Sequence, residues 1–299
     1  MFSVVVVAFR RAENLQTIVE GIPSWVNEIY LFIDGDDTKS QSNQACKDKG
    51  RALALGNPKI SVKVSEKNLG PGLSVPTAIE WASKTCDGTL VLEDDCIPTE
   101  QAYKFFKKEY ERQPNTGIIC GSSPFDFQGK SSTMKSLTTS DFALVSGWLI
   151  TKSAWQKLGI FDLKSFSYLQ LLRAAATDFW KFLPLSYFYA SIIKVRKNNV
   201  QAWDSALCYS MLINNVRATI PNVTLINNLG ADEFATNTHP IKTSHSNAYQ
   251  IASDHEVAST LDDSLSANKI CNKAFIANVY SMKLRHIFSP LKSWIVTRK

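Results

Sequence analysis

Three consecutive carboxylates, Glu93, Asp94 and Asp95, follow a short apolar run from Thr89 to Leu92. Adjacent carboxylates repel one another, so a buried strand end that carries them requires a compensating cation. Hard oxygen ligands of this kind suit a divalent metal such as Mg²⁺ or Mn²⁺, which usually binds together with phosphate groups. The alternative is a solvent-exposed acidic turn, and the other polar clusters of the chain bear on the choice.

Two more polar clusters follow apolar runs that are typical of buried strands. Arg10 and Arg11 come after the run from Ser3 to Phe9, and the segment from Asp34 to Asp37 comes after Ile29 to Ile33. In open parallel sheets, ligands bind beyond the carboxyl ends of the strands. The three clusters therefore predict a binding site at one sheet edge, although Asp and Gly after Ile33 are also typical of a simple turn.

The elements that would position these clusters alternate as strand and helix. Leu15, Ile18 and Val19 recur at helical spacing before Gly21 and Pro23 end the helix. A polar helix is expected from Ser40 to Leu55, a strand from Ile60 to Val64, and a helix capped by Ser74 with Pro76 in its first turn. This order predicts a mostly parallel α/β sheet with right-handed crossovers.

The second half of the chain is less regular. Strands are expected at 117–121, 145–152 and 221–226, and a polar loop at 125–139. Residues 164–197 are rich in Leu, Phe and Tyr and are expected to be helical and buried. A further amphipathic helix is expected from Trp203 and Asp204, and residues 232–255 are polar and expected to be irregular.

Composition narrows the class of protein. The chain has 299 residues, 44% hydrophobic, with a net charge of +6 and six scattered cysteines. That charge is too small to indicate nucleic-acid binding, and the cysteine spacing predicts free thiols in a reducing compartment. We find no secretory signal and no apolar run long enough to span a membrane, so we expect a cytoplasmic protein. Gly70-Pro71-Gly72 is not a dinucleotide-binding fingerprint.

Taken in order, these features resemble a GT-A glycosyltransferase. The resemblance covers about residues 1–240 and is carried by Ala8-Phe9-Arg10-Arg11, Asp34, Glu93-Asp94-Asp95, and a downstream set that comprises Gly147-Trp148-Leu149-Ile150-Thr151, Trp203-Asp204, Pro221-Asn222-Val223, Asn228-Leu229-Gly230 and His239. It is similar to family 2-type bacterial sugar transferases and to the N-acetylglucosaminyltransferase I group, whose metal motif is Glu-Asp-Asp. It implies the GT-A fold, a Rossmann-like, mostly parallel sheet flanked by helices, here with a C-terminal helical extension.

The resemblance also implies roles for individual residues. Asp95 would coordinate Mn²⁺ or Mg²⁺ against the donor diphosphate, with His239 completing that shell. Asp34 would hydrogen-bond the nucleotide base. The other residues expected to bind the nucleotide-sugar are Ala8, Phe9, Arg10, Asn68, Gly70, Glu93, Asp94, Gly147 and Trp148.

Asp204 matches the catalytic base of the inverting members, which takes a proton from the acceptor hydroxyl. An Asp in a first helical turn is also favoured by the helix dipole alone, and Asp232 and Glu233 are rival bases. His239 could equally be a solvent-facing histidine.

The expected function is metal-dependent, inverting transfer of one sugar from a nucleotide-diphosphate sugar, expected to be UDP-linked, to a glycan or lipid-linked acceptor in bacterial surface polysaccharide synthesis. The processive Q-x-x-R-W motif is absent, which favours a single addition per encounter.

The expected domains are 1–245, with a nucleotide half (1–121) and an acceptor half (122–245), and an extension at 246–299. Its basic amphipathic tail could contact the inner membrane face or dock on the domain. The alternatives are a sugar-nucleotide pyrophosphorylase and a non-catalytic carbohydrate- or membrane-binding protein.

Overall fold

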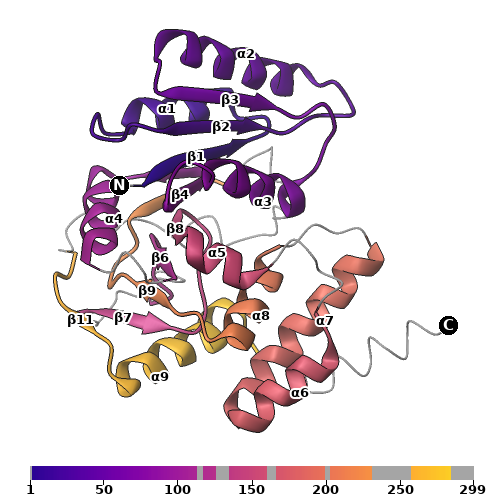
Figure 1. The fold of residues 1–299 in the computed structure, drawn as a ribbon, viewed down its shortest axis with the longest axis vertical. Helices are drawn as coiled ribbons and strands as arrows, with labels where there is room; N and C mark the ends of the chain where they lie inside the picture. Colours follow the sequence, from indigo (N-terminus) through magenta and orange to yellow (C-terminus); the bar gives the residue numbers. More distant parts are fainter. Residues whose placement is uncertain are drawn as a thin grey trace.

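The computed structural model describes residues 2–112, 117–125, 135–159, 166–198, 203–230 and 257–283. Within these ranges the central feature is a nine-stranded sheet with the strand order β11-β7-β9-β6-β8-β4-β1-β2-β3 (Figure 1). Its strands are β1 (Ser3–Ala8), β2 (Ile29–Ile33), β3 (Ile60–Val64), β4 (Gly88–Glu93), β6 (Ile118–Cys120), β7 (Leu137–Ser140), β8 (Trp148–Thr151), β9 (Ala218–Ile220) and β11 (Leu261–Asp262). A separate two-stranded ribbon pairs β5 (Cys96–Pro98) with β10 (Ile226–Asn228).

The strands β4, β1, β2 and β3 are parallel neighbours, as the sequence predicts. Val7 of β1 pairs with Glu93 of β4, and Ala8 pairs with Ile33 of β2. Because parallel strands end at the same edge, this register places the residues after β1, β2 and β4 side by side. The sheet is mixed beyond β4, because β8 runs antiparallel to both β4 and β6. β6 therefore points in the same direction as β4.

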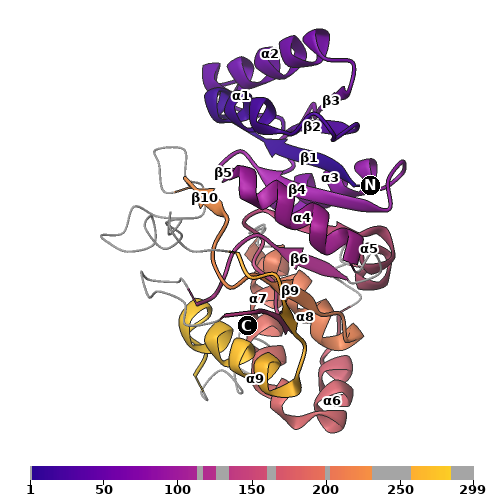
Figure 2. The ribbon, with the colours of Figure 1, turned by 90° about the vertical axis from the view of Figure 1, so that its left-hand side faces the viewer.

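Helices cover both faces of the sheet (Figures 1 and 2). They are α1 (Ala12–Gly21), α2 (Gln41–Gly56), α3 (Pro71–Ala82), α4 (Glu100–Arg112), α5 (Lys152–Leu158), α6 (Tyr168–Thr177), the 3₁₀ turn η3 (Phe179–Lys181), α7 (Phe182–Asn198), α8 (Asp204–Asn214), α9 (Leu265–Ala274) and the π-helical η4 (Phe275–Val279). Successive residues of a strand face opposite sides. Val5 and Val7 accordingly join a core with α3, α5, α7 and α8, whereas Val4 and Val6 join a core with α1 and α4. The result is a mixed α/β fold with a mostly parallel central sheet.

Several local predictions were wrong. Helix α3 begins at Pro71 after Gly70, which has a φ of 62°, so Ser74 is inside the helix and not its cap. Proline at the first helical position has a favourable φ and needs no N–H partner, which explains the earlier start.

The strand expected at 221–226 lies instead at Ala218–Ile220, with a separate strand at Ile226–Asn228. Part of the expected loop at 125–139 is strand β7. Residues 168–177 and 179–198 are helical as expected, but Leu169 and Phe179 in this region are 55% and 82% exposed. The domain boundaries remain a prediction, and residues 284–299 of the tail lie outside the described residues.

Candidate active site

Asp94, the middle carboxylate of the acidic triplet, is a structural residue that joins β4 to the start of α1. It is buried, and its carboxylate accepts hydrogen bonds from the backbone N–H groups of Phe9 (2.8 Å) and Arg10 (3.3 Å). Its other oxygen forms an ion pair with the guanidinium of Arg11 at 2.7 Å. The Asp94 charge is therefore compensated from within the chain, and the predicted contact of Asp94 with the donor remains a prediction.

Glu93 and Asp95 flank Asp94. The Cys96 thiol donates a hydrogen bond to Asp95 at 3.2 Å, and the charge of Arg11 lowers the pKa of both carboxyl groups, but burial outweighs these effects. Burial, together with the charges of Asp95, Asp94 and Asp204, raises the pKa of Glu93 to about 8 against the opposing effect of Arg11. Burial also raises the pKa of Asp95. Desolvation combined with like charge is the environment that a bound cation would relieve.

Asp204 lies at the first position of α8 and belongs to the same electrostatic cluster, because its charge acts on Glu93. The Asp204 carboxylate accepts a hydrogen bond from the backbone N–H of Ser205 at 2.8 Å, and burial raises its pKa. Residues more than a hundred positions apart in the sequence thus meet at the carboxyl end of β4. A carboxylate with a raised pKa is a better proton acceptor for a substrate hydroxyl than an ordinary aspartate.

The β5–β10 ribbon covers Asp95. The backbone N–H of Leu229 donates to the Asp95 carbonyl at 2.8 Å, and Gly230 N–H donates to the Asn228 side chain at 2.8 Å. A Cβ atom at Gly230 would collide with Oδ2 of Asp95. The segment after β10 therefore approaches the acidic cluster so closely that only a glycine fits at position 230 without movement.

Asp34 organises the loop before α3. Its carboxylate accepts from the backbone N–H groups of Gly35 (2.9 Å), Leu69 (2.9 Å) and Gly70 (2.7 Å). Burial raises its pKa, and these hydrogen bonds oppose that rise. Asn68 accepts from Gly70 N–H at 2.9 Å. Asp34, Asn68 and Gly70 are thus brought together at the same edge, and their contact with a nucleotide base stays a prediction.

Arg10 continues this edge toward α2. Its guanidinium pairs with Asp36 at 2.7 Å and lies over the Phe9 ring, 4.5 Å from the ring centroid. Asn43 of α2 donates to the carbonyls of Phe9 (2.7 Å) and Asp34 (3.0 Å), which ties the ends of β1 and β2 together. Hydrogen bonds and an ion pair therefore hold the predicted residues Ala8, Phe9 and Arg10 in place beside the acidic cluster.

Gly147 and Trp148 lie at the start of β8. Gly147 has a φ of 66°, and Ile226 leaves no room for a side chain there. Trp148 is fully buried, and its ring stacks on Trp203 with 5.5 Å between centroids. Since Trp203 directly precedes Asp204, the buried Trp148 supports the start of α8. Direct contact of Gly147 or Trp148 with a donor sugar stays a prediction.

His239, Asp232 and Glu233 lie outside the described residues. Sequence reasoning assigned no role to two residues that the structure places at the site, Arg11 and Asp36. The sequence could have indicated Arg11 and Asp36, because Arg10 and Arg11 follow β1 directly. Two adjacent arginines at an edge that is rich in carboxylates each need a carboxylate partner.

A divalent metal is compatible with the donors present. Among the described residues, no group of three or more His, Cys, Asp or Glu side chains is arranged as a metal cage. Mg²⁺ and similar ions are usually held by one or two carboxylates, with phosphate and water as the other ligands. Glu93 and Asp95 provide two such carboxylates, and burial raises the pKa of each.

Comparisons with known proteins give limited information. No protein-family model matches the chain, and no curated protein matches its sequence. Among solved structures, it is similar to the mannosyltransferase PcManGT from Pyrobaculum calidifontis in complex with GDP-Man and Mn2+. The match has 15% identity and a TM-score of 0.40, and covers 53% of this chain and 46% of that one. The chain thus matches about half of that protein's length, and a similarity of this extent does not identify an activity.

No helix in the described ranges is both long and apolar enough to cross a lipid bilayer.

Proposed function

We propose that this protein is a metal-dependent, inverting glycosyltransferase that transfers one sugar from a nucleotide-diphosphate sugar to a hydroxyl of a glycan or lipid-linked acceptor. The observation that carries the proposal is that Glu93 and Asp95 lie at the carboxyl end of β4 and that Glu93 is close enough to Asp204 for the two charges to interact. In this arrangement, two carboxylates are suited to bind the metal ion of a metal–diphosphate complex, and the third is suited to accept a proton. We further propose a UDP-linked donor, a role in bacterial surface polysaccharide synthesis, and a catalytic unit at residues 1–245.

In this proposal each residue has a defined task. Asp204 accepts the proton of the acceptor hydroxyl as that oxygen attacks the anomeric carbon, and the bond to the leaving diphosphate breaks. Asp95, with Glu93 in place of the nucleotide-sugar role that the resemblance implies for it, would hold Mn²⁺ or Mg²⁺, which when bound would neutralise negative charge on the diphosphate. Asp34 and the backbone of the 68–70 loop position the nucleotide. Arg11 holds Asp94 and thereby sets the turn from which Asp95 projects.

The test separates nucleotide binding from chemistry. Calorimetry with UDP and Mn²⁺ should show binding by the wild-type chain, and by an Asp204→Asn variant with similar affinity. Donor hydrolysis and transfer, screened by mass spectrometry over a panel of nucleotide-sugars, should fall by about 10²–10⁴-fold in Asp204→Asn, the usual contribution of a general base.

The matched control is Asp87→Asn, because Asp87 is exposed and precedes β4 at its other end. The control should behave as the wild type does. Retained turnover in Asp204→Asn would assign the base elsewhere, with Asp232 and Glu233 the next candidates. Absence of UDP binding at millimolar concentration would favour the non-catalytic alternative, and activity that is insensitive to EDTA would remove the metal from the proposal.

A further inference from the structure

A second cavity lies at the opposite edge of the sheet from the acidic cluster. It has a volume of about 1170 Å³ and includes Gly117 and Arg217, which immediately precede β6 and β9. It also includes Asp141 and Ser153, which follow β7 and β8. Since β6 points in the same direction as β4, the residues before β6 and those after β4 occupy opposite edges. None of the residues assigned to the proposed active site lines this cavity.

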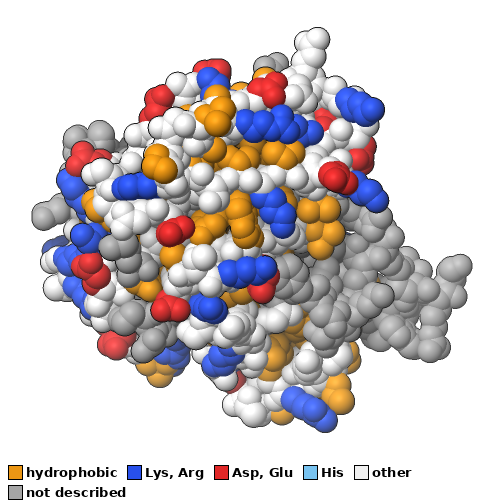
Figure 3. All heavy atoms as spheres, turned by 45° about the horizontal axis from the view of Figure 1, so that its top comes forward, with side chains coloured by type: hydrophobic (Ala, Val, Ile, Leu, Met, Phe, Trp, Pro, Cys, Tyr) orange, Lys and Arg blue, Asp and Glu red, His pale blue; other side chains and the backbone are white. Residues whose placement is uncertain are grey.

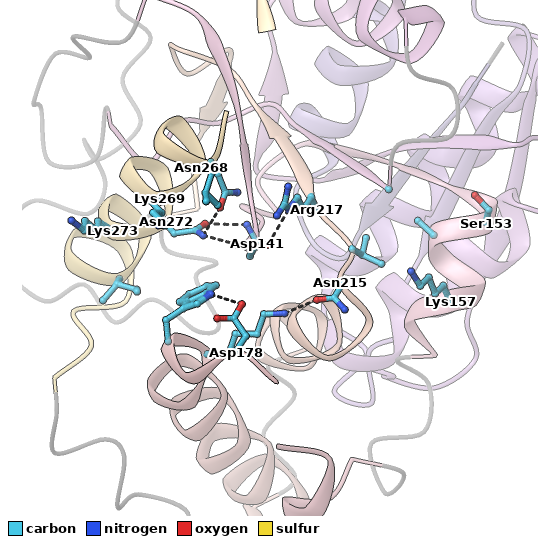
Figure 4. Close-up of a pocket in the computed structure, with 17 residues that line it drawn as sticks. Asp141, Ser153, Lys157, Asp178, Asn215, Arg217, Asn268, Lys269, Asn272 and Lys273 are labelled. Atoms are coloured by element: carbon cyan, nitrogen blue, oxygen red, sulfur yellow. Dashed lines mark hydrogen bonds and ion pairs between the residues drawn. The ribbon is translucent and has the colours of Figure 1, made fainter. Parts of the chain in front are cut away.

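The cavity is basic. Five of its lining residues are cationic and two are acidic (Figure 4); the cationic ones are Lys157, Lys181, Arg217, Lys269 and Lys273. The two carboxylates already have partners within the cavity wall. Asp141 pairs with Arg217 at 3.3 Å and accepts from Asn272 at 2.6 Å, and Asp178 accepts from the Trp180 indole at 2.8 Å. The remaining cations therefore leave a net positive charge around the cavity.

Lys181 is a buried cation in the cavity wall. It is 8% exposed, and its ammonium donates to the Leu212 carbonyl (3.1 Å) and to the Asn215 side chain (2.5 Å). Both partners carry no formal charge and lie at the C-terminal end of α8, whose partial negative charge favours a cation. No carboxylate in the described part of the chain is within ion-pair distance of this ammonium. A lysine has three donors, so one remains available. A buried cation with only neutral partners is stabilised by a ligand that carries negative charge.

Apolar side chains are exposed around the same end of the molecule. Seven of the ten large hydrophobic residues that are exposed in the described ranges belong to α6, η3 and α9; they are Tyr168, Leu169, Leu172, Phe179, Trp180, Leu265 and Ile270. Trp180 and Leu265 also line the cavity. In both ribbon views α6 and α9 form the end of the molecule opposite α2 (Figures 1 and 2). On the face seen with the α2 end forward, basic and acidic side chains are interspersed with each other and with hydrophobic side chains (Figure 3).

We propose that this end, formed by α6, η3 and α9, binds the surface of a membrane that contains anionic phospholipid, with a lipid phosphate group in the cavity beside Lys181. Exposed aromatic and aliphatic side chains next to lysines are the combination that favours the interface between headgroups and acyl chains. A soluble anion would account for the cations but not for the exposed Leu, Phe and Ile side chains around them. This binding is independent of the proposed transferase activity.

The experiment measures sedimentation of the full chain with vesicles of phosphatidylcholine, with and without phosphatidylglycerol. Binding is expected only with phosphatidylglycerol, and it should weaken as salt is raised, because exposed charges are screened. The double variant Lys269→Gln/Lys273→Gln should lower the partition coefficient by about 30-fold, since each lysine near an anionic surface contributes about a factor of five. Phe179→Ser should also weaken binding, without a change in charge.

The control variant carries Lys47→Gln and Lys63→Gln, which remove the same charge from α2 and β3 at the other end of the molecule. It should bind vesicles more tightly than the α9 double variant, and circular dichroism should show that every variant is folded. Equal loss of binding in the two double variants would overturn the proposal, as would absence of binding to phosphatidylglycerol vesicles. Saturable binding of inorganic phosphate without vesicle binding would assign the cavity to a soluble anion. A dimer that Phe179→Ser dissociates would assign the exposed face to a second copy.

Discussion

Replacing Glu93 by glutamine should stabilise the protein when no metal is present. Burial and the neighbouring carboxylates raise the pKa of Glu93 from 4.5 to about 8. A carboxylate whose folded-state pKa is raised binds more protons in the folded chain than in the unfolded chain. The free energy of unfolding of the metal-free protein should therefore fall as the pH rises from about 4.5 to about 8. Glutamine at this position removes that penalty.

The size of the effect follows from the shift. One pKa unit corresponds to about 1.4 kcal/mol, so the interval between 4.5 and pH 7 corresponds to about 3.5 kcal/mol. Because the Glu93 side chain is partly exposed, solvent screening reduces the expected gain to about 1–2 kcal/mol. For a chain of this size, that corresponds to a rise in melting temperature of about 2–6 °C. At pH 5, where Glu93 is protonated in the folded state, the gain should nearly vanish.

The assay is thermal unfolding in EDTA at pH 5 and pH 8, repeated at pH 8 with Mn²⁺. Mn²⁺ should raise the melting temperature of the wild type more than that of Glu93→Gln, because the variant has lost one of the proposed metal ligands. Glu66→Gln, an exposed glutamate, is the control and should show no difference at either pH. A lower melting temperature for Glu93→Gln in EDTA at pH 8 would refute the inference that the ionised form of Glu93 destabilises the metal-free fold.

Two further substitutions test the surroundings of the cluster. Gly230→Ala should lower Mn²⁺ affinity and transferase activity by about tenfold or more and destabilise the fold by about 1–3 kcal/mol, because its Cβ would collide with Asp95. The control is Gly21→Ala, whose Cβ would meet no atom within 4 Å. An active Gly230→Ala enzyme with normal Mn²⁺ affinity would contradict the close approach of Gly230 to Asp95. Burial raises the pKa of Asp36, but hydrogen bonds from Ser40, Thr38 and Arg10 outweigh burial and hold the pKa well below its usual range. The stability that Asp36 contributes is therefore present above about pH 4 and is lost as the pH falls further. Asp36→Asn should cost about 2 kcal/mol at pH 7 and flatten the acid limb of the stability curve measured by urea unfolding; an unchanged acid limb would show that Asp36 is not the group responsible.

Much of the first half of the fold could be predicted from the sequence, because its signals are local. The β-branched run in β1 and the strand that ends at Glu93 are buried on both faces, as continuous apolar runs indicate. The strand–helix alternation then placed the carboxyl ends of β1, β2 and β4 at one edge, and the structure confirms it. The start of α8 at Asp204 was also correct, since Leu207 and Met211 fall on its buried side.

The elements that were predicted wrongly depend on contacts distant in sequence. Strand β9 has only three residues and pairs with β6 and β7, so its short pattern could not be told from the apolar residues that follow it. The exposure of Leu169 and Phe179 could not be read from composition, because an apolar residue is buried only where another element covers it.

The chemistry of the site divides in the same way. The residue types of the Glu93-Asp94-Asp95 triplet, and its position after a buried strand, are properties of the sequence alone. Only the tertiary structure distinguished the three carboxylates: the backbone after β1 and Arg11 compensate Asp94, whereas burial raises the pKa of both Glu93 and Asp95, and the charge of Asp204 acts on Glu93. The physical reason is that hydrogen bonding and electrostatic energy depend on distances between atoms, and the chain brings residues 94, 11 and 204 together only when the sheet and its crossovers have formed.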